Sequence, residues 1–191
     1  RILRPPVGDP LAYHLPFAVE WLQRGDLRMP VPPAGDPSTP FYPLNSSLWI
    51  FWLLAPFESE ILARFVQLPF LLLLGLAVYR LARELDLPTP AAWLAGTLAV
   101  SVPDVARSAS LPENDLIIAA LLVTATASLA RLYCSFSGWR ALMAALAIGL
   151  AVGVKVIAVA YGAPPGLAWL ALVLLRGRPA GWRRVAGVLA G

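Results

Sequence analysis

The sequence predicts an all-α fold, a polytopic bundle of transmembrane helices with interfacial helices in a loop on the outer face of the membrane. Hydrophobic residues make up 59% of the 191 residues and charged residues only 14%, whereas a soluble domain carries about a quarter charged residues. The mean hydropathy is +0.70. Long apolar runs recur without the alternating pattern of a β-barrel, so helices are the structure that satisfies the backbone in lipid.

Residues 1–57 are predicted to form the outer loop, because they mix Pro, Asp, Arg and Tyr and contain no run long enough to cross a bilayer. Within this loop, Pro10–Arg24 is predicted to be an amphipathic interfacial helix, with Asp9 as its N-cap and Gly25 at its end. Its apolar face consists of Leu11, Leu15, Ala18 and Leu22, with Phe17 and Trp21 on the margins. Leu44–Phe57 is apolar but only about 14 residues long, so we predict a second interfacial or re-entrant helix.

Residues 58–191 are predicted to form the transmembrane part, with about five spanning helices of roughly 20 residues or slightly fewer. The predicted spans are Ile61–Leu81, Ala91–Val105, Leu116–Tyr133, Ala141–Gly153 and Val156–Leu175. The chain begins at Arg1 and ends at Gly191 within a new apolar run. We therefore expect it to be an internal stretch of a longer protein, truncated in its C-terminal part.

The placement of basic residues predicts the orientation of these helices. Alternating the spans puts one group on one side of the membrane: Arg80, Arg83, Arg131, Arg140, Arg176, Arg178, Arg183 and Arg184. The short loops on the other side hold Arg64, Arg107 and Lys155. Because short loops rich in Lys and Arg stay cytoplasmic, residues 1–57 and the loop from Arg107 to Asp115 are predicted to face outward.

The single cysteine, Cys134, falls in a predicted cytoplasmic loop and is assigned no role. One cysteine excludes an internal disulfide framework and a cysteine-based metal cluster.

Several polar residues are predicted to converge on the outer face: Asp9, Tyr13, His14, Arg64, Glu113, Asp115 and Lys155. Each also has a purely structural interpretation. Asp9 and the Glu113–Asp115 cluster are suited to cap helices, His14 is a lone histidine on an interfacial helix, and basic side chains near a membrane surface extend towards the headgroups. Ionisable groups near the bilayer nevertheless tend to mark a ligand path, so the residues predict an outward-facing polar pocket at the membrane edge.

Short motifs follow one another along the chain in a particular order. They are Gly8-Asp9-Pro10-Leu11-Ala12-Tyr13-His14, Trp21-Leu22-Gln23-Arg24-Gly25-Asp26, Pro30, Tyr42-Pro43-Leu44, Phe57-Glu58-Ser59-Glu60, Arg64, Asp115 and Gly153-Val154-Lys155. The ordered set resembles the GT-C glycosyltransferases that use polyprenyl-phosphate sugars, a group that includes the protein O-mannosyltransferases and the bacterial lipid A aminoarabinose transferases. The resemblance covers essentially the whole chain.

The resemblance implies a reaction and a location. A sugar would pass from a polyprenyl-phosphate donor to an acceptor hydroxyl with inversion at the anomeric carbon, and Asp9 would act as general base. The acceptor would be a lipid, a glycan or a protein. The protein would reside in the bacterial inner membrane with its catalytic loop facing the periplasm, so we expect membrane lipids and no nucleic acid among its partners.

The same resemblance implies roles for the other residues of the outer pocket. Arg64 and Lys155 would bind the leaving phosphate, because it gains negative charge as the sugar departs. Tyr13 and His14, one helical turn after Asp9, would orient a hydroxyl. Asp115, together with Glu113, would shape the pocket for the sugar or the acceptor.

The chain also departs from the family pattern. Pro10 stands where a second acidic residue is common, and Phe41 and Tyr42 replace acidic and basic residues often found before the Pro of the apolar segment. We therefore assign no divalent metal or other cofactor from this sequence. Two other classes stay open, a carrier of lipid-linked sugars and a non-catalytic subunit of an envelope complex. Carriers usually bind substrate near the membrane midplane, whereas the polar residues here lie at one surface, which favours an enzyme.

Overall fold

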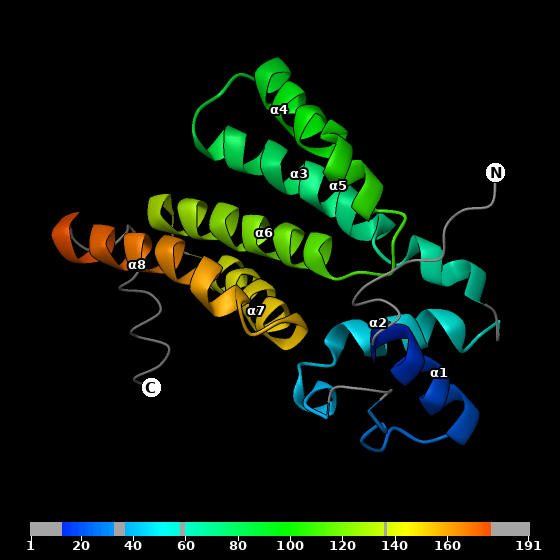
Figure 1. The fold of residues 1–191 in the computed structure, drawn as a ribbon. Helices are drawn as coiled ribbons and strands as arrows, with labels where there is room; N and C mark the ends of the chain where they lie inside the picture. The colour runs from blue at the N-terminus through cyan, green and yellow to red at the C-terminus, as the bar shows by residue number, and fades with distance from the viewer. Residues whose placement is uncertain (1–12, 33–36, 58–59, 136, 177–191) are drawn as a thin grey trace.

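The computed structural model describes residues 13–32, 37–57, 60–135 and 137–176, and these residues form helices and connecting loops without a β-strand (Figure 1). The all-α prediction is confirmed for this part of the chain. The predicted helix start at Asp9 and Pro10 lies outside the described residues, as do Glu58 and the basic residues after Arg176.

The first two helices, α1 (Leu15–Arg24) and α2 (Asn45–Leu54), pack against each other. Phe17, Ala18 and Trp21 are the buried residues of α1. The prediction that Phe17 and Trp21 lie on the margins of the apolar face is therefore wrong. The reason is tertiary: α2 and the residues ahead of it cover this face of α1, so the two bulkiest side chains turn into the protein.

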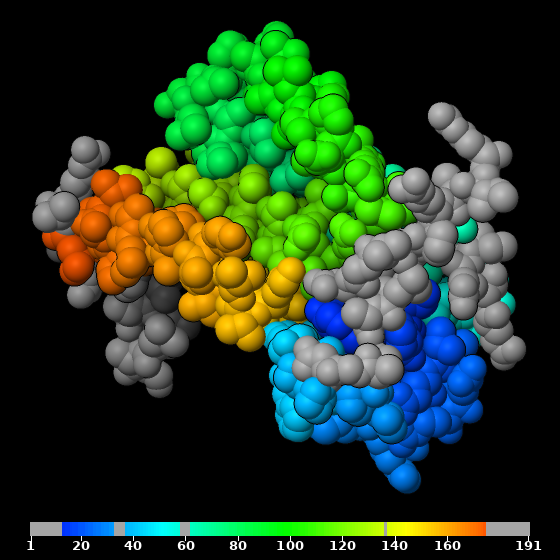
Figure 2. Space-filling view, in the orientation of Figure 1, coloured from blue at the N-terminus to red at the C-terminus, as the bar shows by residue number. Residues whose placement is uncertain are grey.

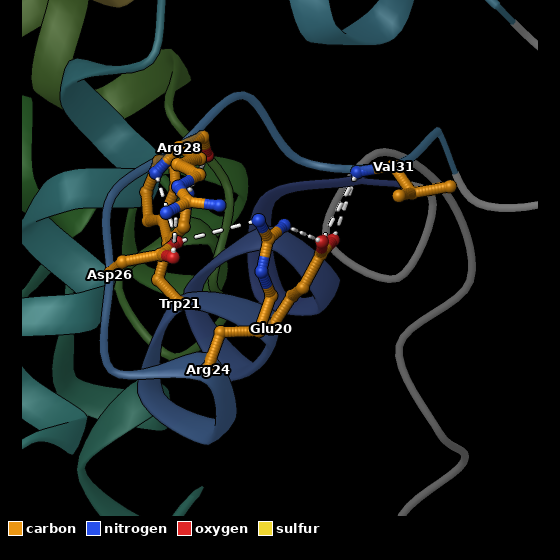
Figure 3. Close-up of polar contacts among 6 residues, drawn as sticks. All are labelled: Glu20, Trp21, Arg24, Asp26, Arg28 and Val31. Carbon is orange, nitrogen blue, oxygen red and sulfur yellow. Dashed lines mark hydrogen bonds and ion pairs between the residues drawn. The ribbon is translucent and has the colours of Figure 1, made fainter.

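Polar contacts close the C-terminal end of α1 (Figure 3). Gly25 ends the helix in the left-handed conformation with φ 70°, as expected for a C-terminal glycine. The indole Nε1 of Trp21 donates to the carbonyl of Arg28 at 2.8 Å. Glu20 accepts a hydrogen bond from the backbone N–H of Val31 at 3.0 Å. The charged side chains in this region are Glu20, Arg24, Asp26 and Arg28. These contacts fold the following loop back over α1.

The remaining helices form the body of the molecule (Figure 1). Two short 3₁₀ helices, η2 (Thr39–Phe41) and η3 (Glu60–Phe65), lie before it in the chain. The body consists of α3 (Leu68–Glu84), α4 (Thr89–Ser101), α5 (Pro103–Ser108), α6 (Asp115–Cys134), α7 (Gly138–Val154) and α8 (Ala158–Arg176). In it, α6 is central and packs against α3, α7 and α8, while α4 covers the far side of α3.

Two helical segments of the described chain are long and apolar enough to cross a membrane, Leu62–Glu84 and Asp115–Cys134. They match two of the predicted spans. Gly138–Val154 and Ala158–Leu174 are apolar but shorter.

The predicted span Ala91–Val105 is wrong at its C-terminal end. The helix stops at Ser101, and a new short helix begins at Pro103. Val102 is extended, with φ −57° and ψ 125°, because the residue before a proline is driven away from the helical region. Pro103 also lacks the N–H that would continue the helix.

The contact between α3 and α4 depends on two glycines that face each other. A Cβ atom on Gly96 would lie 2.6 Å from the carbonyl oxygen of Gly75, which is closer than real contacts allow. We expect Gly96→Ala to force the helices apart and to lower the free energy of unfolding by about 1–3 kcal/mol. Denaturant titration of the detergent-solubilised protein measures this. Gly149→Ala is the matched control, because a Cβ there meets nothing within 4 Å; equal stability of the two variants would contradict the prediction.

The α1–α2 unit adjoins the body where α6 begins and α7 ends. Figure 2 shows its residues, in blue and cyan, gathered at one end of the molecule beside the yellow α7. Trp49 of α2 packs against buried residues of α6 and α7 and donates its indole N–H to the carbonyl of Val66 at 2.9 Å. This junction brings polar groups from distant parts of the chain together.

Candidate functional site

A buried histidine links the α1–α2 unit to the start of α6. His14 directly precedes α1 and is 1% exposed. Its Nδ1 lies 3.0 Å from the Ser47 hydroxyl and 3.1 Å from the Ser46 hydroxyl, both on the first turn of α2. Its Nε2 lies 3.0 Å from the amide Nδ2 of Asn114, the residue before α6, which is 100 residues away in the chain. One imidazole thus joins three segments.

The hydrogen bonds and the burial both favour the neutral form of this imidazole. With the Asn114 amide donating to Nε2, the ring proton resides on Nδ1 and is donated to a serine hydroxyl. Burial lowers the pKa of His14 from 6.5 to about 4, with Lys155 acting in the same direction and Asp115 in the opposite one. At neutral pH, His14 is therefore an uncharged connector whose two ring nitrogens are both engaged.

An ion pair lies beside this cluster, between the start of α6 and the end of α7. Lys155 follows the last residue of α7, and its Nζ lies 3.2 Å from Oδ1 of Asp115, the first residue of α6. The Asp115 side chain is 69% exposed and that of Lys155 37% exposed. Because both side chains are exposed, both charges are accessible to a ligand, and an exposed pair of this kind contributes little to stability.

A buried glutamine fixes the loop that carries Asn114 and Asp115. Gln67 is fully buried, and its Nε2 donates to the carbonyls of Ser108 at 2.8 Å and Leu111 at 3.0 Å. Its Oε1 accepts from the backbone N–H of Leu116 at 3.0 Å. Since the first N–H groups of a helix lack partners within the helix, Gln67, the residue directly before α3, caps α6.

An apolar groove of about 280 Å³ adjoins the cluster. It lies between α2, α3, α6 and α7, and its apolar lining includes Trp49, Trp52, Phe70, Leu121, Leu150 and Val154. Asn45 and Ser46 are its polar lining residues, and Ser46 also touches His14. The arrangement suits an amphiphilic ligand, because an apolar chain fits the groove while a polar head would lie near Asn45 and the Lys155–Asp115 pair.

The structure brings several of the sequence-predicted site residues into this one region. The Tyr13 ring is buried with its centroid 4.1 Å from that of His14, and Asp115 and Lys155 form the adjacent ion pair. Glu113 is half-buried in the loop just before Asn114.

Two other predicted residues are not part of this arrangement as described. Asp9, the predicted general base, lies outside the described residues. Arg64 is exposed on η3, and within the described ranges no ion pair or hydrogen bond joins it to the His14 cluster.

Sequence reasoning missed the side chains that hold the site together, namely Ser46, Ser47 and Gln67. Each is polar within an otherwise apolar stretch, which was the available signal. Asn114 was interpreted as part of a helix-capping cluster, and this interpretation is wrong for its side chain. It makes no capping hydrogen bond, because it bonds His14 instead while Gln67 supplies the cap.

In the described part of the chain, no three His, Cys, Asp or Glu side chains lie close enough together to hold a metal ion. No family model, no curated protein and no solved structure matches this chain.

Proposed function

We propose that this chain belongs to a membrane glycosyltransferase that moves a sugar from a polyprenyl-phosphate donor to an acceptor hydroxyl. The reaction takes place on the outer face of a bacterial inner membrane and inverts the anomeric carbon, with Asp9 as general base. The helices around α6 belong to a polytopic bundle, and the α1–α2 unit with the loop ahead of α6 faces the periplasm.

The observation that carries this proposal is the convergence at the start of α6. His14, Asn114, Asp115 and Lys155 come from three distant parts of the chain and meet beside an apolar groove. A lipid-linked sugar has the same division, an apolar chain joined to a charged phosphate and a polar sugar. In the proposal, the apolar chain lies in the groove and the phosphate and sugar lie beside the polar cluster. The order of sequence motifs that resembles the GT-C family supports the choice of reaction.

The chemistry fits the residue types. An aspartate is too weak a base to remove a proton from an alcohol in advance, but it accepts the proton as the new bond forms. Its negative charge also stabilises the cationic character that develops on the sugar. The departing phosphate gains negative charge, which the ammonium group of Lys155 stabilises once the phosphate competes with Asp115 for it.

The test is a transfer assay with the full-length protein in nanodiscs. Radiolabelled polyprenyl-phosphate sugars are incubated with the protein and a membrane extract that supplies acceptors. We expect transfer by the wild type and loss of transfer by Asp9→Asn. Asparagine retains much of the capping ability of aspartate but cannot take the proton.

The outcomes separate the candidate functions. Unchanged transfer by a normally folded Asp9→Asn protein would keep the enzyme class but remove Asp9 as the base. Absence of transfer by the wild type across a broad donor panel would contradict the proposal, and the carrier and the non-catalytic subunit would then be the remaining candidates.

A further inference from the structure

One polar residue of the apolar groove has a side-chain amide that makes no hydrogen bond within the described part of the chain. Asn45 is the first residue of α2 and is half-buried in the groove wall. Ser46, the other polar lining residue, is engaged by His14. Within the described residues, the Asn45 amide has no hydrogen-bond partner. An amide in such a position is free to donate to a ligand.

A glycine of α7 provides the space in which this amide lies. A Cβ atom on Gly153 would overlap the Asn45 amide nitrogen and lie 2.9 Å from its Cγ. The atoms that this Cβ would meet are the end of the Asn45 side chain itself, so a larger residue at position 153 would turn the amide away from its present position. Gly153 therefore determines where Asn45 points.

A cation follows one of the lining residues of the groove directly in the chain. Lys155 lies two residues after Gly153, and Val154 between them lines the groove. The opposite walls of the groove are formed by aromatic and aliphatic side chains of α2, α3 and α6. The lining of the groove thus suits a hydrocarbon chain, and Lys155, next to the lining residue Val154, supplies a positive charge close by.

We propose that Asn45, positioned by Gly153, donates a hydrogen bond to the phosphate of an isoprenoid phosphate whose chain lies in the groove between α2, α3, α6 and α7. The inference rests on the proposed function and assigns the residue that selects a phosphate head over an uncharged one. Lys155 supplies the charge, and Asn45 supplies directional donors. Gly153 is a positioning residue that acts through Asn45.

The test measures equilibrium binding to the full-length protein in nanodiscs with two probes, tritiated undecaprenyl phosphate and tritiated undecaprenol. Asn45→Leu keeps about the size of the side chain and removes both amide donors without adding a charge. We expect it to weaken binding of the phosphate by about tenfold or more and binding of the alcohol by less than about twofold. A residue that only packs would affect both probes equally.

A second pair of variants tests the role of the glycine. We expect Gly153→Ala to weaken phosphate binding by a similar factor, whereas Gly149→Ala, on the same helix with nothing within 4 Å of the added Cβ, leaves it unchanged. Unchanged phosphate binding in Asn45→Leu and Gly153→Ala would overturn the inference, as would equal losses for the phosphate and the alcohol. The binding assay requires no turnover, so it can be read separately from the transfer assay. If the wild type binds the phosphate selectively but transfers no sugar, the proposed reaction is contradicted and the role of Asn45 in phosphate binding is not.

Discussion

Replacing Gln67 with leucine is expected to lower the free energy of unfolding by about 3 kcal/mol or more. Leucine has nearly the same size but makes none of the three hydrogen bonds of the glutamine. The part-buried carbonyl of Leu111 and the buried N–H of Leu116 would lose their partner, while the Ser108 carbonyl would keep only the N–H of Leu111. Each unsatisfied buried group costs about 1–3 kcal/mol, and water does not easily replace a fully buried side chain.

This expectation is checked by denaturant titration of the full-length protein in detergent. Gln23→Leu is the matched control, because Gln23 is exposed on α1, and surface substitutions usually change stability by about 0.5 kcal/mol or less. Hydrogen exchange adds a local measure, since loss of the cap should raise the exchange rate of the first N–H groups of α6 most. A Gln67→Leu protein as stable as the control would show that Gln67 does not hold this loop.

Acidification is expected to destabilise the junction between α1, α2 and α6 through His14. Its pKa is lowered from 6.5 to about 4 by burial, so in the unfolded chain the ring takes up a proton at a higher pH than in the folded protein. Between these two values the unfolded state binds more protons, and stability therefore falls as the pH falls. The loss across this window is about 3 kcal/mol, and above pH 6.5 the contribution of His14 is constant.

The measurement is the free energy of unfolding as a function of pH for the wild type and His14→Asn. Asparagine retains polar groups at this position but does not titrate. The variant should be less stable at neutral pH, and its stability should fall less than that of the wild type between pH 6.5 and 4. If stability falls equally with pH in the two proteins, His14 is not the group responsible, because the pH dependence then comes from other titrating groups.

The helices could be predicted well from the sequence because apolar runs and prolines act locally. The segments from Leu44 and Leu116 match α2 and α6 closely, and Gly25 ends α1 as predicted. The error in the span Ala91–Val105 arose where one local signal competes with another. Pro103 lies inside an apolar run, and its backbone restriction ended the helix that hydropathy continued.

The composition of the site could be predicted only in part. Tyr13, His14, Asp115 and Lys155 were selected because charged, aromatic or titratable side chains stand out in an apolar chain. The partners of His14 could not be identified, because Ser46, Ser47 and Asn114 become its neighbours only through the packing of α2 against α1 and of both against α6. Hydrogen bonds between residues this distant leave no periodicity in the sequence.

The close approach of the Asn45 amide to Gly153 could not be predicted from the sequence either. Gly153 was noticed only as part of a motif before Lys155. A glycine is needed at this position because a Cβ atom would overlap the Asn45 amide, and this need arises only from the contact between α2 and α7.

The central claim is that α6 spans the membrane with the polar cluster at its outer end, and the single cysteine allows a direct test. Cys134 is exposed at the end of α6, and Ser110 is exposed in the loop ahead of its start. A membrane-impermeant maleimide is applied to intact spheroplasts that express the full-length protein with every cysteine outside residues 1–191 replaced by serine, carrying either Cys134 or Ser110→Cys in a Cys134→Ser background. The account predicts that Ser110→Cys is labelled in intact spheroplasts and that Cys134 is labelled only after lysis. Labelling of both positions from outside, or the reverse pattern, would contradict it.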